Sequence, residues 1–363
     1  MKINFIDLQR QYQRYKNDID SQIQQVLDTS AYIMGSKVKE LEEKLSAFIG
    51  TKYAIGCASG TDALILALLA LEIKPGDEII TTPFTFIATA EVISLLGAKP
   101  VFADILESTF NIDPQKIESK ITNKTRGIIP VDLFGQCADY DEINQIAQKH
   151  KLFVIEDAAQ SFGSEYKKRK ACSLADIGCA SFFPAKPLGC YGDGGMVFTD
   201  NKTLADTMSS LRVHGKGEHK YENIRIGING RLDTLQAAVL LAKFSHFPEE
   251  IQLRQQVAQR YNKSLKDSVI APSIESYNLS AFAQYCVRVE NRAPLQEQLK
   301  NKGVPTAVYY PKPLHLQPAF KALGYRQGDF PVSEKVADDI LALPMHPYLT
   351  EAEQEFIIDC IKK

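Results

Sequence analysis

Apolar residues along the chain follow two kinds of pattern, and together these predict alternating helices and strands. Between residues 36 and 49, the apolar side chains of Val38, Leu41, Leu45 and Phe48 have the spacing of a helix with one buried face. Short, wholly apolar runs lie between such segments and are typical of strands buried on both faces of a sheet. We expect helices at 12–30, 36–49, 62–71, 87–96 and 139–149, and strands at 53–56, 78–81, 100–103, 126–131, 152–156, 178–183 and 195–198. This alternation predicts an α/β fold on a mostly parallel sheet.

The pattern changes character after about residue 245. A long helix is expected over roughly 248–268, followed by shorter segments and a final helix at 351–362. We interpret this part as a smaller α+β domain, since 363 residues suffice for two domains. The predicted organisation is a large α/β domain at 1–245 and a small C-terminal α+β domain at 246–363.

Composition narrows the class of protein further. Hydrophobic residues make up 45% of the chain and charged residues 24%, as in ordinary globular proteins. The formal net charge of −2 gives no electrostatic reason to expect a nucleic-acid or membrane partner. The seven cysteines include no Cys-x-x-Cys pair, and no apolar run reaches the roughly 18 residues of a membrane span. We therefore expect a cytoplasmic protein, and the spacing of His214 and His219 predicts no metal site.

Lys186 stands out because its surroundings are apolar and rigid. It lies between Pro184 and Pro187, shortly after Phe182 and Phe183. Most lysines are solvated surface groups, but an amine with little water around it loses its proton more easily and becomes a nucleophile. The residue before a proline is biased toward extended geometry, so a loop that projects the amine into a cleft is expected.

Asp157 is the second candidate, because it ends the apolar strand predicted at 152–156. Ligands of open α/β sheets gather at the carboxyl ends of strands, although an aspartate here could equally cap the next helix. Together, Lys186 and Asp157 would supply what pyridoxal phosphate (PLP) requires, an amine for a Schiff base and an acid partner for the pyridinium. The pair favours a PLP-dependent enzyme.

Gly60 and Thr61 follow a predicted strand and open a helix. Glycine lets the backbone approach a ligand closely, and the free N–H groups of a helix start suit a phosphate. The plain alternative is an ordinary helix cap. Ser181 could add a hydroxyl to such a phosphate site, or serve only as a strand residue bonded to backbone.

Other polar and aromatic residues are candidates for contacts to cofactor or substrate. Phe86 could stack on a cofactor ring, although alone it is more typical of a core residue. Arg231 could bind a carboxylate or phosphate with two hydrogen bonds, or form a surface ion pair with Asp233. The aromatic loop around Tyr309 and Tyr310 could line a substrate pocket or pack between domains. His315 closes this loop.

Taken in order, these motifs resemble the DegT/DnrJ/EryC1/StrS family of sugar aminotransferases, which are fold-type I PLP-dependent transferases. The resemblance extends over essentially the whole chain, from Phe5-Ile6-Asp7-Leu8 to Asn229-Gly230-Arg231-Leu232-Asp233. It implies that Lys186 binds PLP covalently and moves the proton, and that Asp157 pairs with the pyridine nitrogen. The other implied contacts to the cofactor come from Gly60, Thr61, Phe86, Gln160, Ser181 and Asn229. Asn229 would reach the phosphate of a neighbouring subunit, so the resemblance implies a homodimer with shared active sites.

Within this family, the loops around Lys186, Arg231 and Tyr310 look most like those of UDP-2-acetamido-2-deoxy-3-oxo-glucuronate aminotransferases. The resemblance implies transfer of the amino group of glutamate, through pyridoxamine phosphate, to the 3-keto position of a UDP-linked N-acetylated keto-uronate for surface polysaccharide such as O-antigen. Arg231, Tyr309, Tyr310 and His315 are the expected substrate contacts.

Three alternatives remain open from the residues. One is an aminotransferase acting on another nucleotide ketosugar, such as a dTDP-3-keto sugar or a UDP-4-keto-6-deoxyhexose. Another is a PLP-binding regulatory protein without catalysis. The third, a nicotinamide-linked dehydrogenase, should carry G-x-G-x-x-G after its first strand, and this chain has no such motif.

Overall fold

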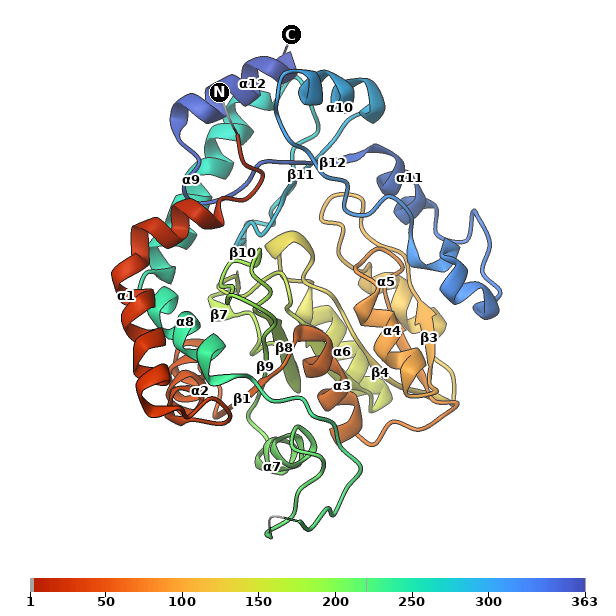
Figure 1. Ribbon diagram of the computed structural model, residues 1–363. Helices are drawn as coiled ribbons and strands as arrows, with labels where there is room; N and C mark the ends of the chain where they lie inside the picture. The colour runs from red at the N-terminus through yellow and green to blue at the C-terminus, as the bar shows by residue number, and fades with distance from the viewer. Residues whose placement is uncertain (1–2, 220, 363) are drawn as a thin grey trace.

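The computed structural model describes residues 3–219 and 221–362, which form a broad α/β part and a smaller C-terminal part (Figure 1). The centre of the larger part is a seven-stranded sheet in the order β1-β9-β8-β5-β4-β2-β3. Its strands are β1 (Tyr53–Cys57), β2 (Glu78–Thr81), β3 (Lys99–Phe102), β4 (Thr125–Ile128), β5 (Phe153–Asp157), β8 (Ile177–Ser181) and β9 (Gly195–Thr199). Only β9 runs against both of its neighbours, β1 and β8, so the expected mostly parallel sheet is confirmed.

Helices cover both faces of this sheet. Neighbouring residues of β5 enter different clusters: Val154 packs on the side of α6, whereas Ile155 packs on the side of α3. This alternation follows from the two-residue period of a strand and explains why the strands read as wholly apolar runs. The helices of this part are α1 (Leu8–Thr29), α2 (Ser36–Ile49), α3 (Gly60–Ala70), α4 (Ala88–Leu95), α5 (Pro114–Ile117), α6 (Tyr140–His150), α7 (Lys202–Leu211) and α8 (Thr234–Phe244).

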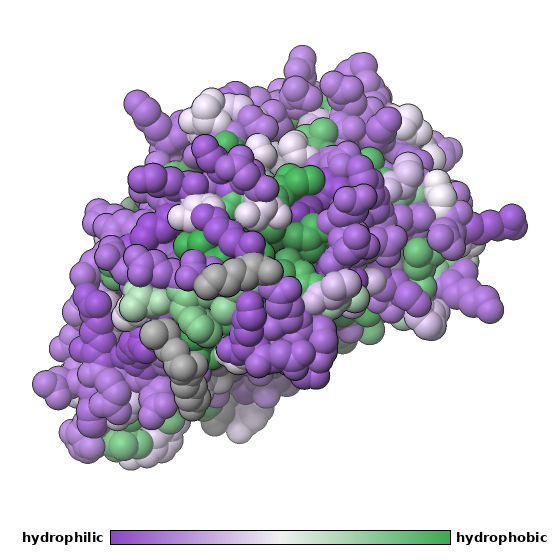
Figure 2. All heavy atoms as spheres, turned by 90° about the horizontal axis from the view of Figure 1, so that it is seen from above, coloured by the Kyte–Doolittle hydropathy of each residue, from purple (hydrophilic) through white to green (hydrophobic). Residues whose placement is uncertain are grey.

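The C-terminal part packs four helices on a two-stranded antiparallel sheet, β11 (Tyr285–Arg288) with β12 (Ile340–Leu343). The helices are α9 (Phe247–Leu265), α10 (Arg292–Asn301), α11 (Pro331–Asp339) and α12 (Glu351–Lys362). The first and last described residues lie at this side of the molecule (Figure 1). Viewed from there, the surface is mostly hydrophilic, with hydrophobic side chains gathered near its middle (Figure 2).

Helix α9 belongs to two hydrophobic clusters at once. Its first turns place Phe247 and Ile251 against the core of the larger part, whereas Val257 and Leu265 lie in the core of the C-terminal part. A second connection is β10 (Asn278–Leu279), which pairs with β6 (Glu165–Tyr166) of the β6–β7 hairpin; β7 is Arg169–Lys170. The predicted boundary at 245/246 therefore coincides with the start of a helix that joins the two cores.

Two predicted strands are longer than the strands observed, for local reasons. The strand expected at 126–131 ends at Ile128, and Pro130, which has no N–H to donate, accepts a hydrogen bond from Asp157 N instead. The strand expected at 178–183 ends at Ser181, because the backbone turns at Phe182 into the loop that carries Lys186. Helices α5, α7 and α11 were not predicted.

Candidate active site

Asp157 lies at the carboxyl end of β5, at the edge of the sheet where ligands of parallel α/β folds gather. Its side chain is buried, and Oδ2 accepts a hydrogen bond of 2.7 Å from Thr89 Oγ1. Oδ1 accepts a weaker bond of 3.2 Å from the backbone N–H of Ala159. Burial raises the pKa of Asp157, while these two donors and the charge of Lys186 oppose that rise. The carboxylate is thus held in one orientation and coupled to the predicted nucleophile.

Lys186 lies in a short loop that is held by backbone hydrogen bonds between its own residues. Its backbone N–H donates to the carbonyl of Phe183 at 2.9 Å, and the N–H of Cys190 closes the base of the loop on Phe182 O at 2.8 Å. The residue is half-buried, and desolvation of its ammonium by surrounding protein lowers the pKa of Lys186 to about 8, with the negative charge of Asp157 acting in the opposite direction. Roughly a tenth of such amines are unprotonated at neutral pH, far more than for a lysine in water.

The start of α3 and the end of β8 form a narrow cradle. A Cβ atom on Gly60 would lie 2.7 Å from Ser181 Cβ, so only glycine allows this approach. Ser59 caps the helix by accepting from Asp62 N at 3.0 Å. The N–H groups of Gly60 and Thr61 belong to the first turn and have no partner within the helix. Backbone donors and a serine hydroxyl therefore converge where an anion such as phosphate would bind.

Gln160 is fixed on both sides of its amide group. Its Oε1 accepts from Phe134 N at 2.7 Å, and its Nε2 donates to the hydroxyl of Tyr310 at 3.0 Å. The Tyr310 ring also lies 6.4 Å from the ring of Phe86. Phe86 remains 56% exposed, so its ring is available to a planar ligand. The structure thus brings together Gln160, Tyr310 and Phe86 from three separate segments.

Asn229 and Arg231 lie on the segment beside the cradle, and Arg231 faces an open groove. Arg231 pairs through its backbone with Cys57, the last residue of β1, shortly before the start of α3. Its side chain lines an open groove of about 660 Å³ together with Lys216 and Arg225. Asn229 is exposed on the same segment. The groove is cationic and suits an anionic ligand or the acidic surface of a partner.

His315 lies elsewhere than the other predicted residues. Its ring is buried against Phe330, with centroids 4.7 Å apart, and Nε2 lies 3.0 Å from Glu334 Oε1. In this chain His315 therefore packs the start of α11. Tyr309 remains half-buried, with its ring 6.0 Å from that of Tyr310.

Two residues that support the site were missed at the level of sequence. Thr89 is a polar position inside an apolar helix, which is the one signal that could have revealed it. Lys243, near the end of α8, is buried and donates a hydrogen bond to the carbonyl of Gly189, at the end of the Lys186 loop. Desolvation lowers the pKa of Lys243 to about 8, while nearby Glu250 opposes this shift.

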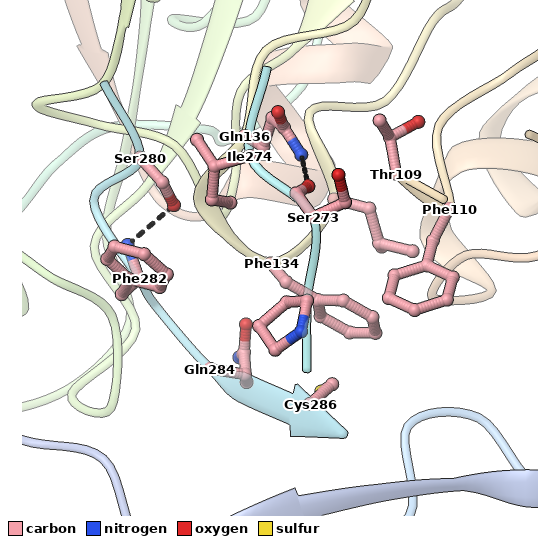
Figure 3. Close-up of a pocket in the computed structure, with 12 residues that line it drawn as sticks. Thr109, Phe110, Phe134, Gln136, Ser273, Ile274, Ser280, Phe282, Gln284 and Cys286 are labelled. Carbon is pink, nitrogen blue, oxygen red and sulfur yellow. Dashed lines mark hydrogen bonds between the residues drawn. The ribbon is translucent and has the colours of Figure 1, made fainter. Parts of the chain in front are cut away.

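A small cavity lies between the segments that carry Phe110, Phe134 and Phe282 (Figure 3). Phe110, Phe134, Phe282 and Cys286 contribute to its mostly apolar lining, and its volume is about 20 Å³. Such a space holds about one water molecule. It is therefore too small for a cofactor.

The residues brought together fit pyridoxal phosphate. Lys186 supplies an amine with a lowered pKa, Asp157 supplies a buried carboxylate that interacts with it, and the start of α3 offers backbone N–H groups to a phosphate. Within residues 3–219 and 221–362, no three His, Cys, Asp or Glu side chains are grouped as metal ligands would be. In the same described residues, no helix is both long enough and apolar enough to cross a bilayer.

Comparison with known proteins gives concordant matches over nearly the full chain. The model of the DegT/DnrJ/EryC1/StrS aminotransferase family matches residues 13–362. A UDP-2-acetamido-2-deoxy-3-oxo-D-glucuronate aminotransferase of Pseudomonas aeruginosa is 53% identical over 356 residues, covering 98% of each chain. A DegT DnrJ EryC1 StrS aminotransferase from Brucella abortus has a crystal structure with a TM-score of 0.96 at 46% identity, covering 99% of this chain and 98% of the other. NtdA from Bacillus subtilis, crystallised with bound cofactor PMP, has a TM-score of 0.92 at 33% identity, covering 100% of this chain and 86% of the other.

Proposed function

This chain belongs to the DegT/DnrJ/EryC1/StrS aminotransferase family, and we propose that it is a PLP-dependent aminotransferase of nucleotide sugars. The proposed reaction moves the amino group of glutamate to the 3-keto position of a UDP-linked N-acetylated keto-uronate. The 53% identity to an aminotransferase of that substrate supports the sugar, and the PMP-bound relative supports the cofactor. The observation that carries the proposal is the Lys186 amine, whose pKa is lowered to about 8 while it remains coupled to the buried Asp157 carboxylate.

Two groups would hold the ring of the cofactor in place. When bound, PLP supplies an electron sink that stabilises negative charge at the carbon losing or gaining a proton. Asp157 would hold the pyridine nitrogen in its protonated form, and Gln160 would lie beside the ring hydroxyl. Phe86 would stack on the ring, because its exposed face is free for a planar group.

Lys186 would act twice, as the covalent anchor and as the general acid–base. An amine with a pKa near 8 can accept a proton from one carbon and return it to another at neutral pH. Gly60, Thr61 and Ser181 would bind the phosphate through backbone N–H groups and a hydroxyl. Cofactor binding would thus place the reacting carbon within reach of the Lys186 loop.

Arg231 is the proposed partner of the sugar carboxylate or of the glutamate carboxylate, since a guanidinium can form two parallel hydrogen bonds with such a group. Tyr309 and Tyr310 would border the sugar or its nucleotide. His315 stays a proposed substrate contact, and its burial against Phe330 makes it the weakest member of the set.

We further propose a cytoplasmic homodimer in which Asn229 of one subunit reaches the phosphate site of the other. Exposed apolar side chains near Asn229 support this assembly, since Ile224 is 57% exposed and Ile226 is 93% exposed. The amino sugar produced would enter bacterial surface polysaccharide, such as O-antigen.

The decisive experiment is a visible spectrum of the purified, PLP-loaded protein, first with glutamate and then with a panel of nucleotide ketosugars. We expect glutamate to abolish the band of the lysine-bound cofactor and to release 2-oxoglutarate. The UDP-linked 3-keto-uronate should restore the band faster than neutral or 4-keto sugars. Lys186→Ala is the matched control and should not turn over.

Each competing function has its own outcome in this experiment. Restoration by a dTDP-linked or UDP-4-keto sugar alone would identify a different nucleotide-sugar aminotransferase. A protein that binds PLP covalently but releases no 2-oxoglutarate would be a regulatory protein. Arg231→Ala should slow the uronate more than a neutral ketosugar, and equal losses on both would remove Arg231 from carboxylate binding.

A further inference from the structure

Two buried carboxylic acids, Asp132 and Glu156, meet beneath the turn that carries Asp157 and Gln160. Both side chains have an exposed fraction of 0%, and the two carboxyls lie close enough for each to shift the pKa of the other. Within the described part of the chain, neither carboxyl forms an ion pair with a lysine, arginine or histidine. Two adjacent negative charges in a dry site without a cation are strongly unfavourable, so one of the two carboxyls keeps its proton.

The donors around each acid indicate which one is charged. Asp132 Oδ1 accepts from Ala138 N at 3.0 Å and from the Tyr140 hydroxyl at 2.9 Å, and Oδ2 accepts from Ser161 Oγ at 2.9 Å. Three donors at one carboxyl favour its ionised form. Burial, partly offset by these donors, raises the pKa of Asp132 only to about 6.

Glu156 has fewer donors and faces groups that carry no positive charge. Its two oxygens accept from Cys172 N at 2.6 Å and Leu174 N at 2.9 Å. The neighbouring titratable groups are Asp132, the phenol of Tyr140 and the thiols of Cys137, Cys172 and Cys179. Burial, followed by the Asp132 charge, raises the pKa of Glu156 well above its ordinary value. The proton of the pair therefore resides on Glu156.

The same two acids hold both ends of the turn 157–160. Glu156 immediately precedes Asp157 on β5 and, by the alternation of a strand, points to the opposite face of the sheet. Ser161 immediately follows Gln160, and its hydroxyl bonds to Asp132. The backbone N–H of Asp132 also donates to Asp157 O at 3.0 Å. Asp132 thus holds Asp157 and Ser161 at the two ends of the turn, and Glu156 is held beside it by the backbone of Cys172 and Leu174.

We propose that Asp132 and Glu156, sharing one proton, form a positioning unit that fixes the turn 157–160 and so sets the orientation of Asp157 and Gln160. This rests on the proposed function, because Asp157 and Gln160 are there assigned to the ring of PLP. The unit touches neither cofactor nor substrate. It acts through the backbone and through the Ser161 hydroxyl.

Ser161→Ala and Tyr140→Phe form a matched pair that separates positioning from stability. Each removes one hydroxyl that donates to Asp132 at 2.9 Å, but only Ser161 belongs to the end of the turn. We expect Ser161→Ala to weaken PLP binding to the apoprotein by about three- to tenfold, the factor that one ordinary hydrogen bond represents. It should also shift the pH midpoint of the visible spectrum. Tyr140→Phe should lower the melting temperature and leave the PLP affinity within about twofold. Equal effects of the two variants on PLP affinity would overturn the proposal.

A second pair of variants tests where the proton lies. Glu156→Gln keeps an N–H donor toward Asp132, as a protonated acid does, whereas Asp132→Asn removes the charge that three donors surround. We expect wild-type protein at neutral pH to show the infrared carbonyl stretch of a buried, protonated carboxylic acid, and Glu156→Gln to lose it. PLP affinity should fall more in Asp132→Asn than in Glu156→Gln. Should Asp132→Asn fail to fold, the infrared difference between wild type and Glu156→Gln decides, and its absence would overturn the shared proton.

Failure of this inference is distinguishable from failure of the proposed function. If the site does not take PLP, wild-type protein itself will show no saturable binding of PLP and no lysine-bound visible band. If only the positioning unit is wrong, wild-type protein will bind PLP normally and Ser161→Ala will match Tyr140→Phe.

Discussion

The hydroxyl of Thr89 donates a hydrogen bond of 2.7 Å to Oδ2 of Asp157. Thr89 lies on α4 and is buried, so it connects that helix to the carboxyl end of β5. It also lies 3.0 Å from the hydroxyl of Thr85, which can donate to it while Thr89 directs its single proton to Asp157. Two threonines thus orient the acid that is proposed to face the pyridine nitrogen.

Replacement of Thr89 by valine should therefore weaken the cofactor site without changing its shape. We expect PLP affinity to fall by roughly ten- to a hundredfold, which corresponds to loss of a hydrogen bond to a charged group. Thr89→Ser keeps the hydroxyl and should lie close to wild type. The measurement is titration of the apoprotein with PLP, and equal affinities for Thr89→Val and wild type would contradict the role of this bond.

The pH dependence of Lys186 should respond to Asp157 in a defined direction. The pKa of Lys186 is lowered to about 8 by burial, and the Asp157 charge raises it against that effect. In apoprotein, condensation of Lys186 with PLP should therefore accelerate through a midpoint near pH 8. Asp157→Asn removes the opposing charge and should move the midpoint to lower pH. Lys186→Ala corrects for other amines, and a midpoint that rises in Asp157→Asn would refute the coupling.

Gly60→Ala should close the cradle at the start of α3. The added Cβ would lie 2.7 Å from Ser181 Cβ and 3.3 Å from Ser181 Cα, so backbone must move. We expect a loss of stability of about 1–3 kcal/mol, typical of overpacking, and weaker binding of PLP and of inorganic phosphate. Because the clash is with the side chain of Ser181, the double variant Gly60→Ala with Ser181→Gly should regain stability. A double variant no more stable than Gly60→Ala would show that the contact is unimportant.

Lys243 should leave a signature in the pH dependence of stability. Its pKa is lowered from 10.5 to about 8 in the folded protein. Between these values the unfolded chain binds more protons at this site than the folded chain, so the Lys243 contribution to stability rises with pH by up to about 1.4 kcal/mol per unit. In Lys243→Met this rise should be absent from denaturant-unfolding curves at pH 8–10. An unchanged slope would show that Lys243 titrates as a solvated lysine.

The proposed dimer depends on the loop that precedes Asn229. Ile226 is 93% exposed, and an aspartate there should weaken association by placing a charge in a buried interface. The dimer dissociation constant, measured by sedimentation, should rise by tenfold or more (about 1.4 kcal/mol), with a parallel loss of activity. Ile270→Asp, at a 63% exposed position of the C-terminal part, is the control. Wild-type association of Ile226→Asp would exclude this loop from the interface.

Sequence reasoning could point to those parts of the candidate site that local pattern encodes. A few consecutive residues are enough to recognise each of three features: the apolar strand that ends in Asp157, the proline-flanked Lys186 and the helix start at Gly60. The alternation of helices and strands likewise predicted a mostly parallel sheet. The antiparallel direction of β9 was not predicted, because strand direction depends on how connections cross the sheet.

The supporting residues could not be predicted, because their partners are distant in the chain. Thr89 is 68 positions from Asp157, and Lys243 is 54 positions from Gly189. A buried lysine or threonine looks like any helix residue until the fold places an acceptor beside it. His315 shows the reverse case, since its aromatic loop looked suited to a substrate pocket, whereas packing against Phe330 buries its ring.

Helix α9 has a mechanical consequence. Phe247 anchors one end in the core beneath the sheet, and Leu265 anchors the other in the core near the chain termini. The two parts of the molecule are therefore connected by one continuous helix, which offers no hinge along its length. If the two parts close around a bulky sugar, α9 must tilt as a rigid unit. The movement would then strain its Phe247 end, three residues after the end of α8, the helix that carries Lys243.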